Sequence, residues 1–385
     1  MRTINWIGYD EQTGYGNASA GLIKALQEEG VSVEQTLIKR GNPGNGGKLV
    51  SDESSGAHSK AEAVVIHTVP EYYPYWVKRR RAALPHAPIW GYTAWETDRI
   101  PSHWTGLLNS MDGIFVPSRW NREVLLACGV QVPVAVLPHV SEFQGQKPEV
   151  APSRPLAAAL EQAEGDFLFY CINMWNERKN IPLLIQAFLE EFGQEEKVSL
   201  LLKTDRSDWS VYRRNWRRLY LKPSFGSSRK SFKELTQHHP NRSRVIHLTS
   251  PLPAADLAWI HQKGDCFISC TRGEGWGMGA YEAAWYGNAV AMTSYGGQLD
   301  YLSPDDAYLM PYTLKAVETA YGGASYAREQ RWADVDIREV RAVLRAVFSN
   351  QTKARERGAL LRQRVSGTFT NTRIANTCTE VLFHD

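Results

Sequence analysis

The feature that most restricts the fold of this chain is a regular alternation of short apolar segments with amphipathic segments of helical period. Such alternation is typical of α/β layers, in which helices cover a parallel sheet. In the first half we expect six strands, from Ile4–Tyr9 to Val134–Leu137, with the clearest helices at Ala18–Glu29 and Asn121–Cys128. Residues 141–155 are polar and contain three prolines, which is the composition of a linker.

The alternation starts again after this linker. We expect five further strands, at Phe167–Ile172, Ser199–Lys203, Val245–Leu248, Cys266–Ser269 and Ala289–Thr293. With 385 residues the chain is long enough for two domains with full cores. We therefore predict two doubly wound α/β domains, residues 1–145 and 146–373. In such folds ligands lie at the carboxyl ends of the strands.

Composition narrows the class of protein. Hydrophobic residues make up 43%, charged residues 22%, and the formal net charge is only +3, so global charge does not indicate a nucleic-acid binder. The five cysteines are scattered and odd in number, which favours reduced thiols in a cytoplasmic protein over a disulfide framework. We expect neither a signal peptide nor a membrane span, because no apolar run has the required length.

Positive charge is concentrated in two segments that are also rich in aromatic residues, 72–82 and 206–233. Taken singly, each is best interpreted as a solvated helix face. Together they indicate a partner that is anionic and partly apolar, such as a lipid-phosphate carrier, contacted peripherally at the inner face of a membrane. A nucleic-acid strand is the alternative partner for residues 206–233.

Two glutamates eight residues apart, Glu274 and Glu282, mark the segment with the most distinctive chemistry. Glu274 lies in a glycine-rich turn after an apolar strand, followed by Gly275, Trp276 and Gly277, and Glu282 lies in the helix that comes next. A strand, a glycine loop and a helix N-terminus leave several backbone N–H groups unpaired, which suits the oxygens of a sugar or a phosphate. Each carboxylate offers two acceptor oxygens to neighbouring sugar hydroxyls.

Two adjacent cations, Arg178 and Lys179, follow the strand that ends at Ile172 and precede a helix. Cations at a helix N-terminus oppose the helix dipole by roughly a few tenths of a kcal/mol, so a bound anion explains their position better than a solvated surface does. We expect a diphosphate clamp here. Lys203, at the end of the next strand, is a candidate third cation.

In the first half, Gly14 and Gly16 lie in the loop that links the first strand to the first helix. Glycines there let the backbone approach a ligand closely, and Glu34 ends the second strand about twenty residues later, so a dinucleotide-binding fingerprint has to be weighed. The third glycine of that fingerprint is absent, because Ser19 stands in its place.

Other polar side chains of the first half come at strand ends or just after them. Glu96 and Asp98 follow the strand that ends at Tyr92 and are candidates for binding sugar hydroxyls. His67 ends a strand and His139 precedes the linker. Each histidine either faces a ligand or packs inside its domain.

The spacing of Glu274 and Glu282 resembles the E-x7-E signature of the GT4 family of retaining, nucleotide-sugar-dependent glycosyltransferases, which have the GT-B fold. The run around Arg178 and Lys179 resembles the Arg-Lys-Asn element of that family, although Asn173 stands where many members carry an arginine. The resemblance covers nearly the whole chain. It implies two Rossmann-like domains that face each other across a cleft, with residues 374–385 crossing back to the first domain.

The resemblance also implies roles for individual residues. Glu274 would bind the donor sugar, Glu282 the ribose, and Arg178 with Lys179 the diphosphate. The remaining donor-side residues would be Gly14, Gly16, Asn173, Lys203, Gly275, Trp276 and Gly277. Glu96 and Asp98 would serve the reacting sugar, and Glu96, His67 and His139 would bind the acceptor.

The implied function is retaining hexosyl transfer from a UDP- or GDP-sugar to a hydroxyl of a glycan or lipid-linked saccharide, as in polysaccharide biosynthesis. It implies no metal and no other cofactor, because fixed cations can stabilise the departing diphosphate. Asp334 and Asp336 form a D-x-D triplet before a helical stretch, which we interpret as an N-cap and not as metal ligands. Three alternatives stay open: a glycosyltransferase acting on nucleic acid, an NAD-dependent oxidoreductase and a non-catalytic sugar-binding protein.

Overall fold

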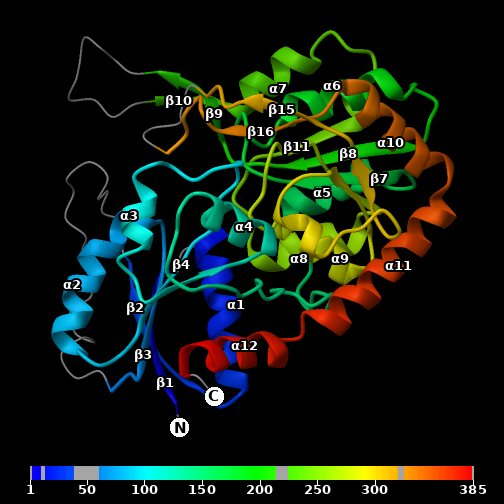
Figure 1. Ribbon diagram of the computed structural model, residues 1–385. Coiled ribbons are helices and arrows are strands. Elements are labelled where there is room, and N and C mark those ends of the chain that lie inside the picture. Colours follow the sequence, from blue (N-terminus) through cyan, green and yellow to red (C-terminus); the bar gives the residue numbers. More distant parts are fainter. Residues whose placement is uncertain (1, 10–13, 39–59, 214–223, 320–324, 384–385) are drawn as a thin grey trace. The chain divides into compact units, whose positions relative to one another are not determined.

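The computed structural model describes residues 2–9, 14–38, 60–213, 224–319 and 325–383. The chain divides into two compact units, unit 1 with residues 1–142 and 366–385, and unit 2 with residues 143–365. Each unit is built around a parallel six-stranded sheet (Figure 1). The α/β class with two doubly wound sheets, predicted from the alternation of apolar segments, is confirmed.

The sheet of unit 1 has the strand order β2-β1-β3-β4-β5-β6. Its strands are β1 (Thr3–Gly8), β2 (Ser32–Leu37), β3 (Ala63–His67), β4 (Ile89–Tyr92), β5 (Gly113–Val116) and β6 (Val134–Val136). The chain builds outward from β1 to β2 and then returns to add β3 on the other side of β1. The order therefore reverses between β1 and β3, which is the switch point where folds of this kind place ligands.

Helices cover both faces of this sheet. They are α1 (Gly14–Glu28), the 3-10 turn η3 (Pro70–Tyr72), α2 (Tyr73–Ala83), α3 (Trp104–Leu108), α4 (Arg119–Ala127) and α12 (Asn371–Phe383). The α12 helix lies along α1, and Asn371 Nδ2 donates to Glu28 Oε2 over 2.8 Å. Ser118 caps α4, because its hydroxyl accepts from the N–H of Asn121 at 3.2 Å.

The sheet of unit 2 has the order β11-β8-β7-β12-β13-β14. Its strands are β7 (Phe167–Ile172), β8 (Val198–Lys203), β11 (Val245–Leu248), β12 (Cys266–Ser269), β13 (Ala289–Thr293) and β14 (Tyr308–Met310). In chain order this is 3-2-1-4-5-6, the doubly wound arrangement of dinucleotide-binding sheets. Its switch point lies between β7 and β12.

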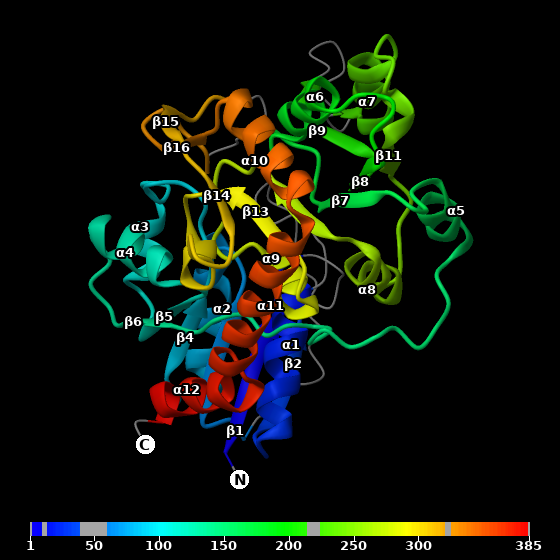
Figure 2. The same ribbon diagram turned by 90° about the vertical axis from the view of Figure 1, so that its right-hand side faces the viewer.

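The helices of unit 2 are α5 (Arg154–Gln162), α6 (Ile181–Glu191), α7 (Ser228–Thr236), α8 (Ala254–Lys263), α9 (Met278–Tyr286), α10 (Ile337–Ser349) and α11 (Gln351–Thr368), with short turns η4 (Arg242–Arg244) and η5 (Gly297–Asp300). The α6 and α10 helices pack together on one face of the sheet, and α8 and α9 lie on the other (Figure 2). The core on the α6 side includes Phe169, Leu200, Ile268 and Leu344, each 0% exposed.

Two small antiparallel hairpins were not predicted, β9 (Ser207–Arg213) with β10 (Ser224–Ser227), and β15 (Thr313–Ala316) with β16 (Arg331–Asp334). Asp336, after β16, caps α10 by accepting from the N–H of Arg338 at 2.9 Å, which confirms the predicted N-cap. Asp334 has a different role, because it pairs with Arg272 at 2.9 Å and with Lys315.

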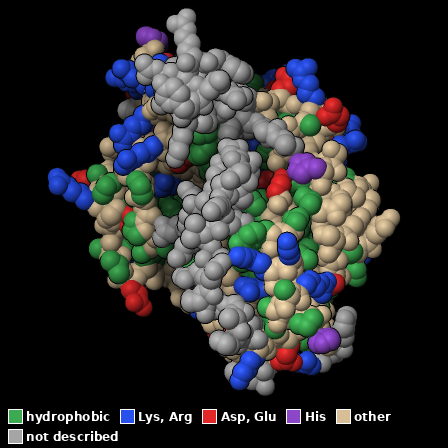
Figure 3. Space-filling model, turned by 90° about the vertical axis from the view of Figure 1, so that its left-hand side faces the viewer, with side chains coloured by type: hydrophobic (Ala, Val, Ile, Leu, Met, Phe, Trp, Pro, Cys, Tyr) green, Lys and Arg blue, Asp and Glu red, His purple; other side chains and the backbone are tan. Residues whose placement is uncertain are grey.

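Two arginines of the first basic aromatic segment are less available for an anionic partner than the sequence suggests. In α2, Arg80 is 6% exposed and donates to Thr36 Oγ1 over 3.0 Å, and Arg81 pairs with Asp112 at 2.5 Å. Lys and Arg side chains in Figure 3 are spread over the visible surface of the described residues. Residues 214–223 of the second segment lie outside the described residues. Within the described part of the chain, none of the helices combines the length and apolarity needed to cross a bilayer.

Candidate functional site

The candidate site of unit 2 lies at the carboxyl edge of its sheet, at the switch point between β7 and β12. Residues 173–180 leave β7 there and form the basic loop, and residues 270–277 leave β12 and form the glycine loop. Because β7 and β12 are paired in parallel, both loops start from the same edge. The amide of Asn173 donates to Ser269 Oγ over 3.1 Å and so joins the two strand ends.

The two loops are joined by hydrogen bonds between their backbones and arginine side chains. The N–H of Arg272 donates to the carbonyl of Arg178 at 2.7 Å, and Arg272 Nη1 donates to the carbonyl of Glu177 at 2.6 Å. In return, Arg178 Nη1 donates to the carbonyl of Gly273 at 2.6 Å. Each loop therefore fixes the conformation of the other.

At the centre of these contacts is Glu274. One carboxylate oxygen accepts from Arg178 Nη1 at 3.2 Å, and the other accepts from Lys179 Nζ and from Thr271 Oγ1, the latter at 2.9 Å. The exposed fractions of the Glu274, Arg178 and Lys179 side chains are only 10%, 14% and 12%. The structure thus brings the predicted sugar-binding carboxylate and the predicted diphosphate clamp into direct contact.

Burial alone would raise the pKa of Glu274. The charges of Lys179 and Arg178 and the hydrogen bonds from Lys179 and Thr271 outweigh burial, so the pKa lies below its ordinary value of 4.5. The carboxylate is therefore ionised near neutral pH. Two nearly buried cations therefore lie side by side at this edge, and such charged donors suit an anionic ligand.

Two glycines with positive φ shape the glycine loop. Gly277, at the N-cap of α9, has φ 87°, and Gly296, after β13, has φ 109°. A Cβ on Gly296 would lie 2.8 Å from the carbonyl oxygen of Glu274, and Gly297 N–H donates to that oxygen over 2.8 Å. Sequence reasoning assigned no role to the Gly296-Gly297 pair. The structure shows that it holds the backbone of Glu274 in place.

The remaining candidates of the glycine loop and of α9 are also buried. Glu282 is 4% exposed on α9, and Gly275 is buried in the loop. Trp276 is 2% exposed, and its ring lies 5.2 Å from the ring of Tyr281 and 5.0 Å from that of Tyr301. This indole packs the loop onto the core of unit 2.

Lys203 lies at the same edge, one strand away from the central cluster. The parallel pairing of β7 with β8 places it beside Ile172, and its Nζ donates to the carbonyl of Thr204 at 2.8 Å. Burial lowers the pKa of Lys203, and Asp205 acts in the opposite direction. Nearby His247 has its pKa lowered to about 4 by burial, then by Arg229 and Lys203, so it is neutral.

In unit 1 the switch point is occupied by a neutral aromatic cluster. His67, at the end of β3, shares a 2.7 Å hydrogen bond with Ser19 Oγ and stacks on Tyr92, with ring centroids 4.2 Å apart. The hydroxyl of Tyr92 lies 3.0 Å from His139 Nδ1. His67 and His139 are only 1% and 8% exposed, and burial lowers the pKa of both, to about 3 for His139.

Glu96 and Asp98 are half-buried in the loop that follows β4. Asn121 of α4 fixes that loop, since its amide donates to the carbonyl of Trp95 at 2.8 Å and accepts from the N–H of Trp95 at 3.3 Å. Sequence reasoning assigned no role to Asn121. The available signal was a polar residue in the first turn of a helix that directly follows a buried strand.

Gly14, Gly16 and Glu34, which suggested a dinucleotide-binding fingerprint, do not lie where that fingerprint requires them. The α1 helix begins at Gly14, so Gly14 and Gly16 lie in its first turn and not in a loop before it. Glu34 pairs with Asn5 inside β2, which continues to Leu37. The fingerprint needs glycines in the turn and an acidic residue at the end of the strand. These residues meet neither requirement.

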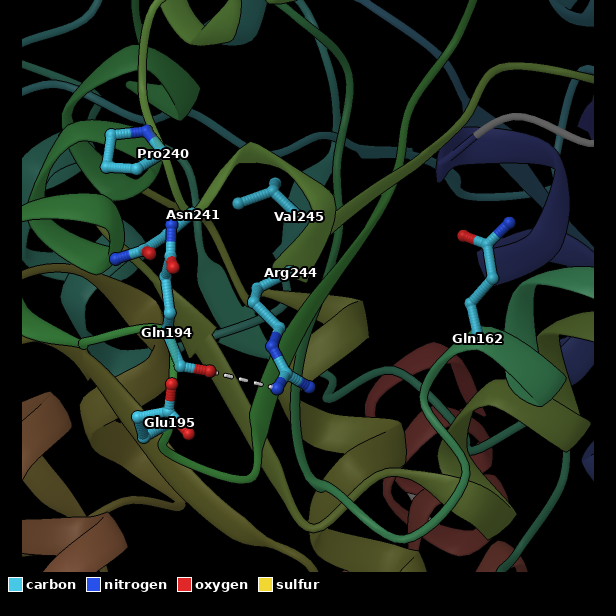
Figure 4. A pocket seen from close by; sticks show the side chains of 7 residues that line it. All are labelled: Gln162, Gln194, Glu195, Pro240, Asn241, Arg244 and Val245. Carbon is cyan, nitrogen blue, oxygen red and sulfur yellow. Dashed lines mark hydrogen bonds between the residues drawn. The ribbon is translucent and has the colours of Figure 1, made fainter.

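A pocket of about 820 Å³ lies at the opposite, amino edge of the unit 2 sheet (Figure 4). Among its lining residues, Arg244 is already satisfied, because it pairs with Asp166 at 2.7 Å and donates to the carbonyl of Gln194 at 3.2 Å. The pocket therefore offers no spare cation for an anion. The charged cluster at the carboxyl edge has the more distinctive chemistry.

No protein-family model matches this chain, and no curated protein matches it. Solved structures do. Anabaena Alr3699/HepE in complex with UDP and glucose is 14% identical over 100% of both chains, with a TM-score of 0.68. Sucrose-phosphate synthase from Thermosynechococcus elongatus is 14% identical over 99% of this chain and 98% of that one, with a TM-score of 0.69.

A trehalose-6-phosphate protein from E. coli bound with UDP-2-fluoro glucose is 12% identical over 99% of this chain and 98% of its own, with a TM-score of 0.67. At these identities the likeness establishes the fold. Together with the two parallel six-stranded sheets, it shows that the chain has the GT-B fold.

Proposed function

We propose that this protein is a retaining glycosyltransferase of the GT4 kind that transfers a hexose from a UDP- or GDP-sugar to a hydroxyl of a glycan or lipid-linked saccharide. The observation that carries the proposal is the ionised Glu274 held between Arg178 and Lys179 at the switch point of unit 2. The similar folds support it, since HepE was crystallised with UDP and glucose and the E. coli protein with UDP-2-fluoro glucose.

In this proposal the diphosphate takes the place that Glu274 now occupies beside Arg178 and Lys179. Both cations are nearly buried, so their interaction with a phosphate is screened weakly by water. Glu274 is then released towards the sugar, where its two oxygens can accept hydroxyl hydrogen bonds. Glu282 would hold the ribose, and Glu96 and Asp98 would serve the acceptor and the reacting sugar.

The proposed reaction breaks the bond between the anomeric carbon and the phosphate oxygen and forms one to the acceptor oxygen on the same face of the sugar. The acceptor proton passes to the departing phosphate. Charge accumulates on the diphosphate as the bond breaks, and a fixed donor aimed at such charge is typically worth ~3 kcal/mol. Arg178, Lys179 and the N-terminus of α9 would supply these donors without any metal or other cofactor.

The proposal is tested by calorimetric titration of the wild-type protein and of the variant Arg178→Ala with Lys179→Ala. We expect the wild type to bind UDP or GDP and not NAD. Loss of two charge-assisted hydrogen bonds, at about 1.5 kcal/mol or more each, should weaken nucleoside diphosphate binding by at least about 100-fold.

The double variant also leaves Glu274 buried without its partners, which is itself destabilising. The control is therefore a triple variant that adds Glu274→Gln, since it restores charge balance without restoring the clamp. It should bind UDP or GDP as weakly as the double variant. Wild-type affinity in the triple variant, or a wild type that binds neither nucleotide, would show the proposal to be wrong.

A further inference from the structure

Tyr301 follows the short turn η5, and its hydroxyl touches the start of α9 in the glycine loop. The hydroxyl lies 3.0 Å from the carbonyl oxygen of Trp276 and 2.9 Å from that of Gly277, and donates to them. The side chain is 0% exposed. None of the motifs described above includes this tyrosine.

The two carbonyl contacts determine where the following N–H groups point. In a planar trans peptide the C=O and N–H bonds point in opposite directions. Tyr301 holds the carbonyl of Trp276 on its own side, and it holds that of Gly277 together with the N–H of Tyr281, which donates to the same oxygen over 3.1 Å. The N–H groups of Gly277 and Met278 therefore point away from the Tyr301 hydroxyl. Neither N–H has a hydrogen-bond partner in the described part of the chain.

These two N–H groups belong to the N-cap and the first residue of α9. N–H groups at that end of a helix have no intrahelical partner, and the helix dipole favours negative charge there. On its own, a helix N-terminus would not indicate a ligand. Here Glu274, three residues before Gly277, brings the nearly buried cations Arg178 and Lys179 to the same loop.

The hydroxyl of Tyr301 is suited to hold this arrangement at any working pH. Burial, followed by electrostatic repulsion from Glu274, Tyr281 and Glu282, raises its pKa well above the ordinary value of 10.0. It therefore stays protonated and can only act as a donor towards the two carbonyls. Glycine at position 277 leaves room for this contact, since its φ is 87° and the Cβ of any other residue there would lie 3.2 Å from the Tyr301 oxygen.

We propose that Tyr301 is a positioning residue that aims the N–H groups of Gly277 and Met278 at the phosphate bonded to the transferred sugar. The inference rests on the proposed function and adds to it the reason why this loop stabilises the leaving group. Tyr301 does not touch the ligand. It acts through the two peptide units, so its loss should affect the sugar-bearing phosphate and not the rest of the nucleotide.

The test measures the affinity of two variants, Tyr301→Phe and Tyr281→Phe, for a nucleoside diphosphate and for the matching monophosphate. The ligand pair is UDP with UMP, or GDP with GMP. Tyr281 is the matched control, because it is equally buried and its ring lies 5.2 Å from that of Tyr301. We expect Tyr301→Phe to weaken diphosphate binding about 10-fold and to leave monophosphate binding unchanged. The variant should lower kcat by a larger factor than the factor by which it changes KM. Tyr281→Phe should change none of these.

The variant Tyr301→4-aminophenylalanine has a hydrogen-bond donor at the position of the tyrosine hydroxyl. It should recover most of the diphosphate affinity that Tyr301→Phe loses. This rescue separates positioning from a general loss of packing and keeps the test valid if the phenylalanine variant folds poorly. Equal weakening of diphosphate and monophosphate, or no weakening at all, would overturn the role of Tyr301 alone. A wild type that binds neither nucleotide would overturn the proposed function as well.

Discussion

The two sheets of this protein carry opposite chemistry at the same topological position. At the switch point of unit 2, Glu274 is ionised between Arg178 and Lys179. At the switch point of unit 1, His67 and His139 are neutral and stacked in an aromatic cluster with Tyr92. The backbone places a potential site at both edges, and the side chains decide which edge can bind an anion.

Burial affects the charge of ionisable side chains differently at the two edges. In unit 2 two cations offset the cost of burying one carboxylate, so the charged state of Glu274 persists. Among the described residues of unit 1, no opposite charge offsets the burial of His67, and His139 lowers its pKa further. We infer that the first edge can exchange its internal ion pair for an anionic ligand.

The largest effect should come from removing the charge at the centre of the unit 2 edge. Glu274→Ala should lower sugar transfer by roughly 100- to 1000-fold, the usual cost of losing one group that stabilises the transition state. It should not weaken UDP or GDP binding, because the variant removes a competitor for Arg178 and Lys179. Nucleotide release assays and calorimetry measure the two quantities, and transfer within 10-fold of wild type would contradict the assigned role.

A smaller effect is expected at the neutral edge. Ser19 is 2% exposed, and its hydroxyl contacts both His67 Nδ1 and Trp6 Nε1. Ser19→Ala leaves both groups without this partner and should lower the free energy of unfolding by about 1–3 kcal/mol. Urea denaturation measures the loss, with the exposed Ser110→Ala as control. A drop in nucleotide affinity in Ser19→Ala would instead show that the two edges are not independent.

The smallest effect should appear in the pH dependence of stability. The folded pKa of His139 is about 3, below the ordinary 6.5, so the unfolded chain binds a proton between these values that the folded chain does not. The free energy of unfolding therefore falls as pH drops below 6.5, by up to about 1.4 kcal/mol per pH unit for this group. His139→Gln should flatten the dependence measured between pH 6 and pH 5.

The same measurement on Glu274→Gln distinguishes the two edges. The pKa of Glu274 is lowered from 4.5, so its contribution is present above that value and is lost only as pH falls through the folded pKa. This variant should leave the slope between pH 6 and pH 5 unchanged. A slope that responds to Glu274→Gln and not to His139→Gln would reverse our assignment of charge to the two switch points.

Much of this architecture could be predicted from the sequence, because buried parallel strands are continuous apolar runs. The strands β7 and β12 have the predicted bounds, Phe167–Ile172 and Cys266–Ser269. Since both loops follow such strands, Glu274 and Arg178 could be expected at one edge. Their direct ion pair could not, because the partners lie about a hundred residues apart and local pattern carries no information on side-chain contact.

Other features were hidden for different physical reasons. Glycine is a poor helix former, so a helix that starts at Gly14 contradicts propensity. The β15–β16 hairpin has no apolar run, since β15 is exposed along its whole length. Tyr301 and Asn121 are polar residues in buried segments, a pattern that core packing produces as often as function does.

The contacts between the basic loop and the glycine loop also determine when, during synthesis of the chain, the candidate site of unit 2 can form. Arg178 is synthesised early in unit 2, yet its partners Gly273 and Glu274 emerge from the ribosome 95 and 96 residues later. A nascent chain that stops before β12 lacks both of these partners of Arg178. Ligand binding by ribosome-bound fragments would therefore appear abruptly with chain length, and would report when translation has passed the glycine loop.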